Sequence, residues 1–339
     1  MDKKVTEQID QAVSHLQRGE VVGIPTETVY GLAAAINSTE GIKKIFSVKQ
    51  RPFFDPLIVH VASIDQAKTC TTDWNPMVDA LARHFWPGPL TLVIPKSNLI
   101  SDLITSGLTS VGLRWPRNET TEAIIQKLGI PLAAPSANLF GRTSPTKASH
   151  VRTEFPDQFF VVQGEDSPIG IESTVLAVKL AHSKYTLSIL RKGALLQSQI
   201  DRFLVKHNFD YQWSMSIEKK EAPGQMKHHY MPSMPFIICR NPSMKLSELS
   251  QILNSKLKEL PDEIEGVRIV KPQKPITKIE FLKLAADPVQ AAREVYSQLR
   301  AASLRNPEAL CFIQMPSHSG ELWESIFDRL YKAASLIVD

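Results

Sequence analysis

Short apolar runs alternate with amphipathic helical segments along residues 1–209 of the chain. Apolar runs bounded by turn residues predict strands at residues 21–24, 57–61, 90–94, 111–114, 132–134, 159–162, 174–178 and 187–190. Apolar residues at helical spacing predict helices at residues 5–16, 41–48, 77–85 and 119–128, and another after Thr146. An alternation of this kind is typical of a layered α/β domain built around a sheet.

The alternation stops at residues 210–235, where Pro223, Gly224 and several charged residues interrupt regular structure. A smaller α/β pattern follows this stretch. It predicts strands at residues 236–239, 266–270 and 310–313, and helices at residues 246–257, 287–302 and 321–334. We therefore expect one domain over residues 1–209, a linker over 210–235 and a second domain over 236–339.

The composition is that of a folded protein. The chain has 339 residues, of which 43% are hydrophobic and 22% charged, and this excludes a mainly disordered chain. No apolar stretch approaches the roughly 20 residues that cross a bilayer, so we expect a cytoplasmic protein with no membrane contact. Cys70, Cys239 and Cys311 lie far apart, which excludes a zinc knuckle and a disulfide framework. The net charge of +4 is too small to require a nucleic-acid partner.

Polar and charged residues stand at the ends of several predicted elements, where open α/β sheets bind ligands. Thr26 and Thr28 follow the first predicted strand and are either ligand contacts or caps of a following helix. Lys49 and Arg51 end the next helix, where they either complement the helix dipole or flank a triphosphate. His60 ends a strand, a position that is more often structural than catalytic.

Two further positions carry the same kind of signal. Arg114 stands near a proline at a strand end, where it either binds a carboxylate or forms a surface ion pair. Ser136 and Asn138, with Arg142 close behind, either cap a turn or hold phosphate oxygens. The chain has no phosphate-binding Gly-x-x-x-x-Gly-Lys-Ser/Thr loop, no Gly-x-Ser-x-Gly elbow and no His-Glu-x-x-His pair. P-loop, covalent serine and zinc-protease mechanisms therefore lack their usual motifs.

Six motifs follow one another in a recognisable order, at residues 25–32, 49–60, 85–92, 131–145, 170–175 and 190–193. In order and spacing they resemble the YrdC/Sua5 family, the L-threonylcarbamoyladenylate synthases. The linker around His229 and Tyr230 and the α/β pattern after it resemble the long, two-domain Sua5 form. The resemblance implies an α/β fold: a YrdC-like twisted open mixed sheet with helices, plus a smaller C-terminal Rossmann-like α/β domain.

The implied reaction joins L-threonine, bicarbonate and ATP into threonylcarbamoyl-AMP and pyrophosphate. The product is the donor for N6-threonylcarbamoyladenosine at position 37 of tRNAs that read codons starting with A. Implied partners are therefore the downstream threonylcarbamoyl transferase machinery and, through the fold, tRNA or double-stranded RNA. We expect Mg²⁺ with the ATP and no zinc. Adenylation of this kind depends on positioning and charge rather than on a covalent intermediate.

The resemblance also implies site residues. The family's Lys-x-Arg and Ser-x-Asn signature corresponds to the catalytic residues Lys49, Arg51, Ser136 and Asn138. The implied ATP contacts are Lys49, Arg51, Asp55, Ser110, Ser136, Ser144 and Arg191, with His229 and Tyr230 from a linker that closes over the site as a lid. The implied threonine contacts are Thr28, His60, Arg114, Ala134 and Ser173.

Asp55 departs from the family pattern, which has asparagine at this position. A carboxylate repels phosphate unless a cation compensates, so we expect Asp55 to face the metal or to have a local cationic partner. Two other functions stay open. A carbamoyl transferase of hydrogenase maturation shares the first domain, but its zinc-binding Cys-x-x-Cys pairs are missing here. A non-catalytic module that binds double-stranded RNA or tRNA would need neither a threonine pocket nor a lid.

Overall fold

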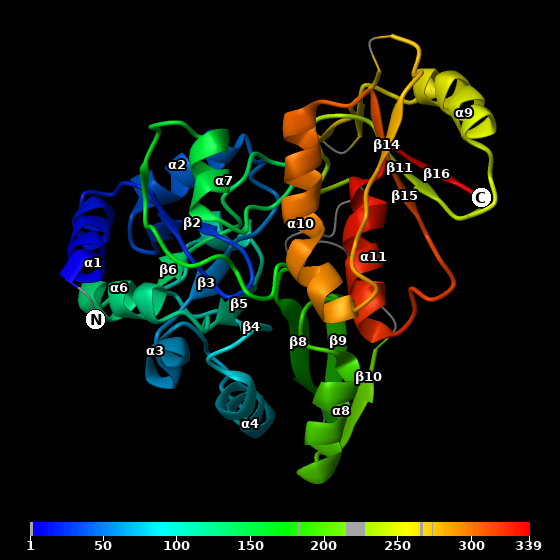
Figure 1. The fold of residues 1–339 in the computed structure, drawn as a ribbon. Coiled ribbons are helices and arrows are strands. Elements are labelled where there is room, and N and C mark those ends of the chain that lie inside the picture. The colour runs from blue at the N-terminus through cyan, green and yellow to red at the C-terminus, as the bar shows by residue number, and fades with distance from the viewer. Residues whose placement is uncertain (1–2, 182–183, 215–227, 265–266, 273) are drawn as a thin grey trace. The chain divides into compact units, whose positions relative to one another are not determined.

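The structure is a computed structural model that describes residues 3–181, 184–214, 228–264, 267–272 and 274–339. The chain divides into two compact units. Unit 1 comprises Met1–Leu139 and Pro145–Gln225, and unit 2 comprises Phe140–Ser144 and Met226–Asp339. The two units are coloured along the chain in Figure 1, and each is described by itself.

Unit 1 is built on a mixed sheet of ten strands in the order β10-β9-β8-β4-β5-β3-β6-β2-β1-β7. Neighbouring strands run both ways, since β5 pairs parallel with β3 and antiparallel with β4. The strands are β1 (Val22–Ile24), β2 (Gly31–Ala35), β3 (Ile58–His60), β4 (Leu90–Pro95), β5 (Ser110–Arg114), β6 (Leu132–Ala133), β7 (Phe160–Val161), β8 (Thr174–Ala181), β9 (Lys184–Arg191) and β10 (Tyr211–Trp213). The expected mixed α/β sheet is confirmed.

Helices cover both faces of this sheet. They are α1 (Lys3–Gln17), α2 (Thr39–Lys49), α3 (Ile64–Thr69), α4 (Pro76–Phe85), α5 (Asp102–Thr105), α6 (Glu119–Leu128), α7 (Ala148–Glu154) and α8 (Gln197–Lys206). Successive residues of β2 join different apolar clusters, because side chains alternate across a strand. Leu32 packs in the cluster that holds α2 and α4, whereas Ala33 packs in the cluster that holds α1 and α6.

All eight strands predicted for this region are present, with ends within three residues of the prediction. Of the two alternatives for Thr26 and Thr28, the cap of a following helix is wrong, because the chain enters strand β2 and pairs antiparallel with β1. The run Gly31–Ala35 consists of glycine, leucine and three alanines, which favour strands weakly, and its pairing with β1 and β6 decides its structure. Strand β10, at the start of the predicted linker, was also missed.

Unit 2 contains a four-stranded parallel sheet in the order β14-β15-β11-β16 and a small antiparallel pair, β12 with β13. Its helices α10 and α11 lie side by side, and α9 packs on the sheet through Leu249, Leu253 and Leu257 (Figure 1). The elements are β11 (Phe236–Cys239), α9 (Leu246–Glu259), β12 (Glu263–Ile264), β13 (Val267–Arg268), β14 (Ile279–Phe281), α10 (Pro288–Arg305), β15 (Ala309–Ile313), α11 (Glu321–Ala333) and β16 (Leu336–Val338). A parallel sheet flanked by helices confirms the expected second α/β domain.

The short segment Phe140–Ser144 belongs to unit 2 although the residues on both sides of it belong to unit 1. Its Gly141 carbonyl accepts a hydrogen bond from Met231 N at 2.8 Å, and Arg142 forms a parallel bridge with Met231. Gly141 has a φ of +74°, and a Cβ at this position would lie 2.7 Å from Val267 Cγ1. Glycine is therefore required here both by backbone conformation and by close packing.

The predicted linker over residues 210–235 spans several kinds of structure. Its residues 211–213 are strand β10, which pairs parallel with β9 in the sheet of unit 1. Residues 215–227 lie outside the described residues. His229 and Tyr230 belong to unit 2. None of the helices that the structure describes is long and apolar enough to span a membrane.

Candidate active site

Lys49 contacts the turn that carries Ser136 and Asn138. It is the last residue of α2 and is 1% exposed. Its Nζ donates hydrogen bonds to Ser136 O at 2.6 Å and to Asn138 O at 2.5 Å. The turn is also held to the region before β2, because Ala137 N donates to Tyr30 O at 2.8 Å. The Lys-x-Arg and Ser-x-Asn halves of the predicted signature therefore meet, although 87 residues separate Lys49 from Ser136.

The helix end that presents Lys49 also directs Arg51 into the protein. Gln50 adopts a left-handed conformation with φ 51° and ends the helix, so the chain reverses between the two cations. Arg51 donates to Asp55 O at 3.1 Å and to Pro56 O at 2.8 Å. Both residues are buried, and Arg51 Nη2 lies 2.9 Å from Asp55 Oδ2. Asp55 thus has the local cationic partner that was one of the two expected arrangements.

Burial and charge act on Asp55 in opposite directions. Removal from water disfavours the carboxylate and raises its pKa, while the positive charges of Arg51, Lys49 and Arg191 act to lower it. Burial has the larger effect, so the pKa of Asp55 is above its usual value. The three cations surround the single carboxylate closely enough to affect its ionisation, which identifies a region of excess positive charge.

Arg114, at the end of β5, forms a buried ion pair rather than the surface pair considered as one alternative. Its Nη2 lies 2.8 Å from Glu27 Oε2 and donates to Thr28 Oγ1 at 2.9 Å. Its Nε donates to Gly88 O at 3.3 Å. The sequence prediction missed Glu27 and the Gly88 carbonyl as partners of Arg114. It assigned Thr28 and Arg114 to the same threonine site, and the structure brings these two residues into contact. The acidic residue within the motif at residues 25–32 was the available signal.

His60 pairs with Arg114 in the parallel register of β3 and β5. It is 4% exposed, and burial together with the positive charge of Arg114 lowers its pKa to about 3. His60 is therefore neutral near pH 7. Its Nδ1 is buried without a hydrogen-bond partner among the described residues. Ala134, another predicted threonine contact, donates its backbone N–H to Ile58 O at 2.9 Å.

Ser173 and Arg191 lie together at the start of β8 and the end of β9. Arg191 donates to Ser173 O at 3.0 Å and to Ser173 Oγ at 3.1 Å. The Ser173 hydroxyl is also 2.8 Å from Thr91 Oγ1 on β4, and all three residues are buried. Thr91 was not predicted, because the turn before it, residues 85–92, gave no chemical signal of its own. The contact between Arg191 and Ser173 joins a predicted ATP-binding residue to a predicted threonine-binding residue.

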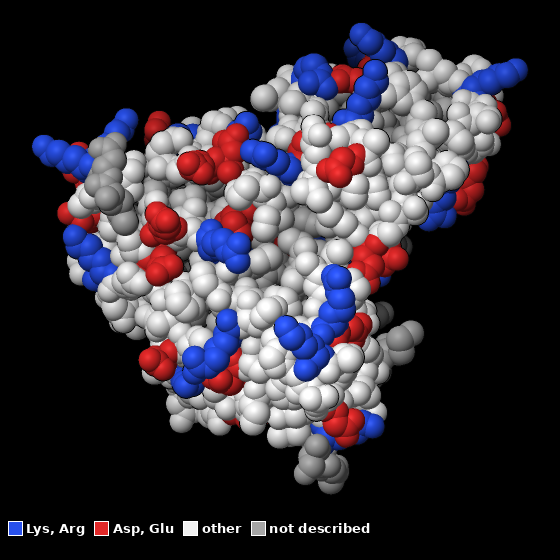
Figure 2. All heavy atoms as spheres, turned by 60° about the horizontal axis from the view of Figure 1, so that its bottom comes forward, with Lys and Arg blue, Asp and Glu red and all other residues white. Residues whose placement is uncertain are grey.

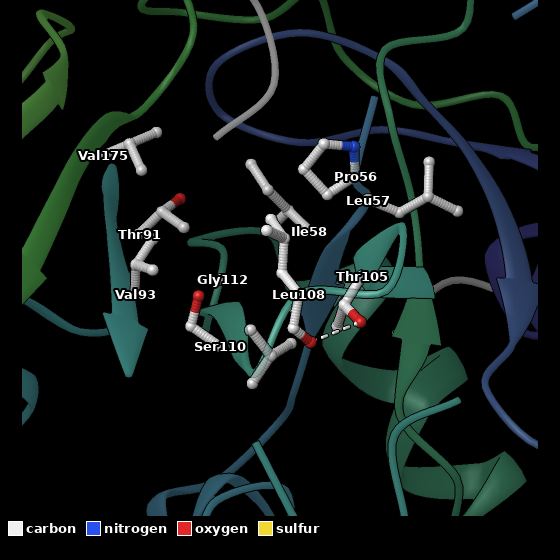
Figure 3. Close-up of a pocket in the computed structure, with 11 residues that line it drawn as sticks. Pro56, Leu57, Ile58, Thr91, Val93, Thr105, Leu108, Ser110, Gly112 and Val175 are labelled. Carbon is white, nitrogen blue, oxygen red and sulfur yellow. Dashed lines mark hydrogen bonds between the residues drawn. The ribbon is translucent and has the colours of Figure 1, made fainter. Parts of the chain in front are cut away.

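A small pocket lies beside these groups in unit 1, with room for about one water molecule. Strands β3, β4, β5 and β8 contribute to it, and Figure 3 shows the hydroxyls of Thr91 and Ser110 among apolar side chains such as Ile58 and Val175. Pro56, whose carbonyl binds Arg51, also lines it. A space of this size is too small for a substrate group.

The remaining predicted nucleotide contacts belong to unit 2. Ser144 O accepts a hydrogen bond from Arg300 Nε at 3.2 Å. Tyr230 has a φ of 67°, and its carbonyl accepts from Thr143 Oγ1 at 3.0 Å. The ring of Tyr230 lies 4.1 Å from that of His229 between centroids. These contacts join the 140–144 segment to the end of the predicted linker within one unit.

The distribution of acidic residues and cysteines bears on metals. The described residues contain no group of three or more His, Cys, Asp or Glu side chains that could hold a metal ion. Cys70, Cys239 and Cys311 are all buried and free.

Acidic and basic side chains are interspersed on the face drawn in Figure 2, and the described residues there form no continuous basic stripe of the kind that favours nucleic acid.

The sequence matches two family models. The Sua5/YciO/YrdC model, described as telomere recombination, matches residues 14–193. The chain belongs to this family. The Sua5 C-terminal model, described as the C-terminal domain of threonylcarbamoyl-AMP synthase, matches residues 195–335. The two matches follow one another along the chain and confirm the resemblance to the two-domain Sua5 form.

Similar proteins agree with the family match. The threonylcarbamoyl-AMP synthase of Bacillus subtilis is 39% identical over 72% of this chain and 70% of its own length. That of Pyrococcus abyssi is 36% identical over 73% of this chain and 72% of its own length. The crystal structure of P. abyssi Sua5 complexed with L-threonine has a TM-score of 0.79 and 30% identity, covering 98% of this chain and 96% of that one.

Proposed function

We propose that this chain is a threonylcarbamoyl-AMP synthase that joins L-threonine, bicarbonate and ATP and releases pyrophosphate. The observation that carries the proposal is the similarity to P. abyssi Sua5 complexed with L-threonine, which extends over nearly the whole of both chains. The assembly of Lys49 with the Ser136–Asn138 turn adds to it, because phosphate transfer needs fixed positive charge.

The nucleotide lies on the cationic region in this proposal. Lys49, Arg51 and Arg191 neutralise the triphosphate, and Ser136 and Asn138 fix it through the turn that Lys49 supports. Ser110 is proposed as a further contact in unit 1. Ser144, His229 and Tyr230, which belong to unit 2, stay predicted nucleotide contacts.

The amino acid lies against Arg114 in this proposal. The guanidinium is already fixed through Nε and Nη2 by Gly88, Thr28 and Glu27, which presets its orientation toward a carboxylate. Neutral His60 supplies a hydrogen bond and no charge. Ala134 and Ser173 complete the predicted threonine contacts, and Ser173 is shared through Arg191 with the nucleotide side.

The proposed reaction depends on how the substrates are positioned. The neutral amine of threonine and bicarbonate combine into a carbamate with loss of water. A carbamate oxygen then attacks the α-phosphorus of ATP, and pyrophosphate leaves from the opposite side. Fixed cations lower the barrier because they neutralise charge that moves to the leaving pyrophosphate. Mg²⁺ is expected with the ATP, because the triphosphate needs a divalent counter-charge. The product is the donor for threonylcarbamoylation of tRNA.

Pyrophosphate release from the purified full chain tests the proposal. The protein is incubated with ATP and Mg²⁺, and threonine or bicarbonate is omitted in turn. We expect release only when both are present. Release that is independent of threonine would contradict the proposal, as would no release from a folded protein that binds ATP.

A further inference from the structure

Glu27 is buried next to the residue that we assign to the substrate carboxylate. It is 4% exposed, and its Oε2 lies 2.8 Å from Arg114 Nη2. Its Oε1 is also buried and has no hydrogen-bond partner among the described residues. A buried carboxylate oxygen without a donor is costly, so this atom is suited to receive one from a ligand.

The backbone holds Glu27 firmly in place. Its carbonyl accepts from Ile169 N at 3.0 Å, and the preceding carbonyl of Thr26 accepts from Ser167 Oγ at 2.9 Å. The Thr26 hydroxyl accepts from Thr28 N and Val29 N, both at 3.2 Å. The carboxylate is therefore presented from a rigid turn, and its position beside Arg114 is fixed before any ligand arrives.

An open cleft of unit 1 lies next to Glu27. Glu27 lines it with Pro87, Arg117 and Gln163. Glu119, Glu122, Glu165 and Asp166 also line the cleft, and their charges favour a cationic group over an anionic one there. The ligand group expected at Glu27 is therefore positively charged.

An α-amino acid carries an ammonium and a carboxylate on the same carbon atom. The Glu27–Arg114 pair presents the opposite charges side by side, at 2.8 Å. The described contacts of Arg114 use Nε and Nη2, which leaves Nη1 for a carboxylate. We propose that Glu27 binds the α-amino group of the amino-acid substrate while Arg114 binds its α-carboxylate. This inference rests on the proposed function and names the residue that selects a free amino group.

Calorimetric titration of the full chain tests the inference with two ligands. One is L-threonine, and the other is 2,3-dihydroxybutanoate, which keeps the carboxylate and the hydroxyl and replaces the amine. We expect the wild type to bind threonine about 10- to 100-fold more tightly, the contribution of one hydrogen bond to a charged group. In Glu27→Gln this ratio falls to about one.

Matched variants separate recognition from a structural role. Glu7→Gln removes an exposed carboxylate outside the cleft and keeps the wild-type ratio. Glu27→Asp retains the charge on a shorter side chain, so its ratio should lie between one and the wild-type value, and it is compared with the wild type where Glu27→Gln does not fold. If Glu27 only balances Arg114, its replacement weakens both ligands equally and leaves the ratio unchanged, which overturns the inference.

The experiment also distinguishes this inference from the proposed function. A wild-type chain that binds threonine and releases pyrophosphate, with an unchanged ratio in Glu27→Gln and Glu27→Asp, overturns the inference alone. A folded wild-type chain that does not bind threonine overturns both.

Discussion

Two buried charged regions of unit 1 differ in their balance of charge. In one, Lys49, Arg51 and Arg191 lie close enough to Asp55 to affect its ionisation, and Arg51 forms an ion pair with it. In the other, Arg114 forms an ion pair with Glu27, and the neighbouring His60 is neutral near pH 7 because its pKa is lowered to about 3. Three cations thus act on Asp55 in the first region, whereas one cation is paired with one carboxylate in the second.

The difference matches two kinds of ligand. A triphosphate needs surplus positive charge, whereas an amino acid with both charges needs one partner of each sign. Ser173 belongs to the first region by contact, since its hydroxyl contacts Arg191 and Thr91. This difference in charge is the basis on which we propose a place for each substrate.

Removal of Lys49 should have the largest effect on the cationic region. Lys49→Ala removes one positive charge and the support of the Ser136 and Asn138 carbonyls. We expect kcat/KM for pyrophosphate release to fall roughly 100- to 1,000-fold, as for other fixed groups that stabilise a transition state. Lys44→Ala, on the exposed side of the same helix, is the control and should retain wild-type activity. Full activity of Lys49→Ala would show that this charge plays no part.

Arg114 should affect the amino acid and spare the nucleotide. Arg114→Ala removes the carboxylate partner, so we expect KM for threonine to rise about 10- to 100-fold with little change in the Kd for ATP. Steady-state kinetics and ATP titration measure the two effects. The exposed Arg202→Ala on α8 serves as control. Equal loss of both affinities would contradict the separation of the two regions.

Replacement of Asp55 should have a smaller effect, which is on the affinity for ATP. Asp55→Asn removes the single carboxylate of the cationic region and restores the residue that the family pattern has there. We expect ATP to bind a few-fold more tightly, because less negative charge faces the phosphates. ATP titration with and without Mg²⁺ measures this. Asp65→Asn, whose side chain is 95% exposed, should have no effect. Unchanged ATP affinity and unchanged Mg²⁺ dependence in Asp55→Asn would argue against this role.

The ionisation of His60 should have the smallest effect, which is a change in the free energy of unfolding with pH. Its folded pKa of about 3 lies below the ordinary value of 6.5, so the unfolded chain takes up a proton first as pH falls. The stability contributed by neutral His60 is present above pH 6.5 and is lost progressively toward pH 3. We expect a loss of about 1 kcal/mol between pH 7.5 and 5.5.

Urea unfolding at the two pH values measures this contribution. The difference in unfolding free energy should be smaller in His60→Gln than in the wild type by about that amount. An identical pH dependence in both proteins would mean that His60 titrates normally in the folded state.

The sequence predicted much of the fold because apolar periodicity is local. Strands such as β4 and helices such as α6 are bounded by turn residues and caps that lie within the element itself, as Asn118 caps α6. Strand β2 was missed because its small residues have weak preference of their own and its pairing partners lie elsewhere in the chain.

The sequence motifs predicted which residues form the candidate site. They did not predict which of these residues contact one another. Thr28 and Arg114 were singled out from separate strand ends, and the structure brings them within 2.9 Å. Glu27 was missed although it lies within a motif that was singled out, and Thr91 was missed because a threonine in a core strand carries no chemical signal alone. Their contacts form only when segments distant in the sequence lie together.

Mass spectrometry of the nucleotide product with labelled substrates tests the central claim most directly. The full chain is incubated with ATP, Mg²⁺, L-threonine and ¹³C-bicarbonate. We predict an adduct of AMP, carbonyl and threonine that contains the ¹³C label and that forms roughly 100- to 1,000-fold more slowly with Lys49→Ala. AMP without an adduct, or an adduct without the label, would contradict synthesis of threonylcarbamoyl-AMP by this protein.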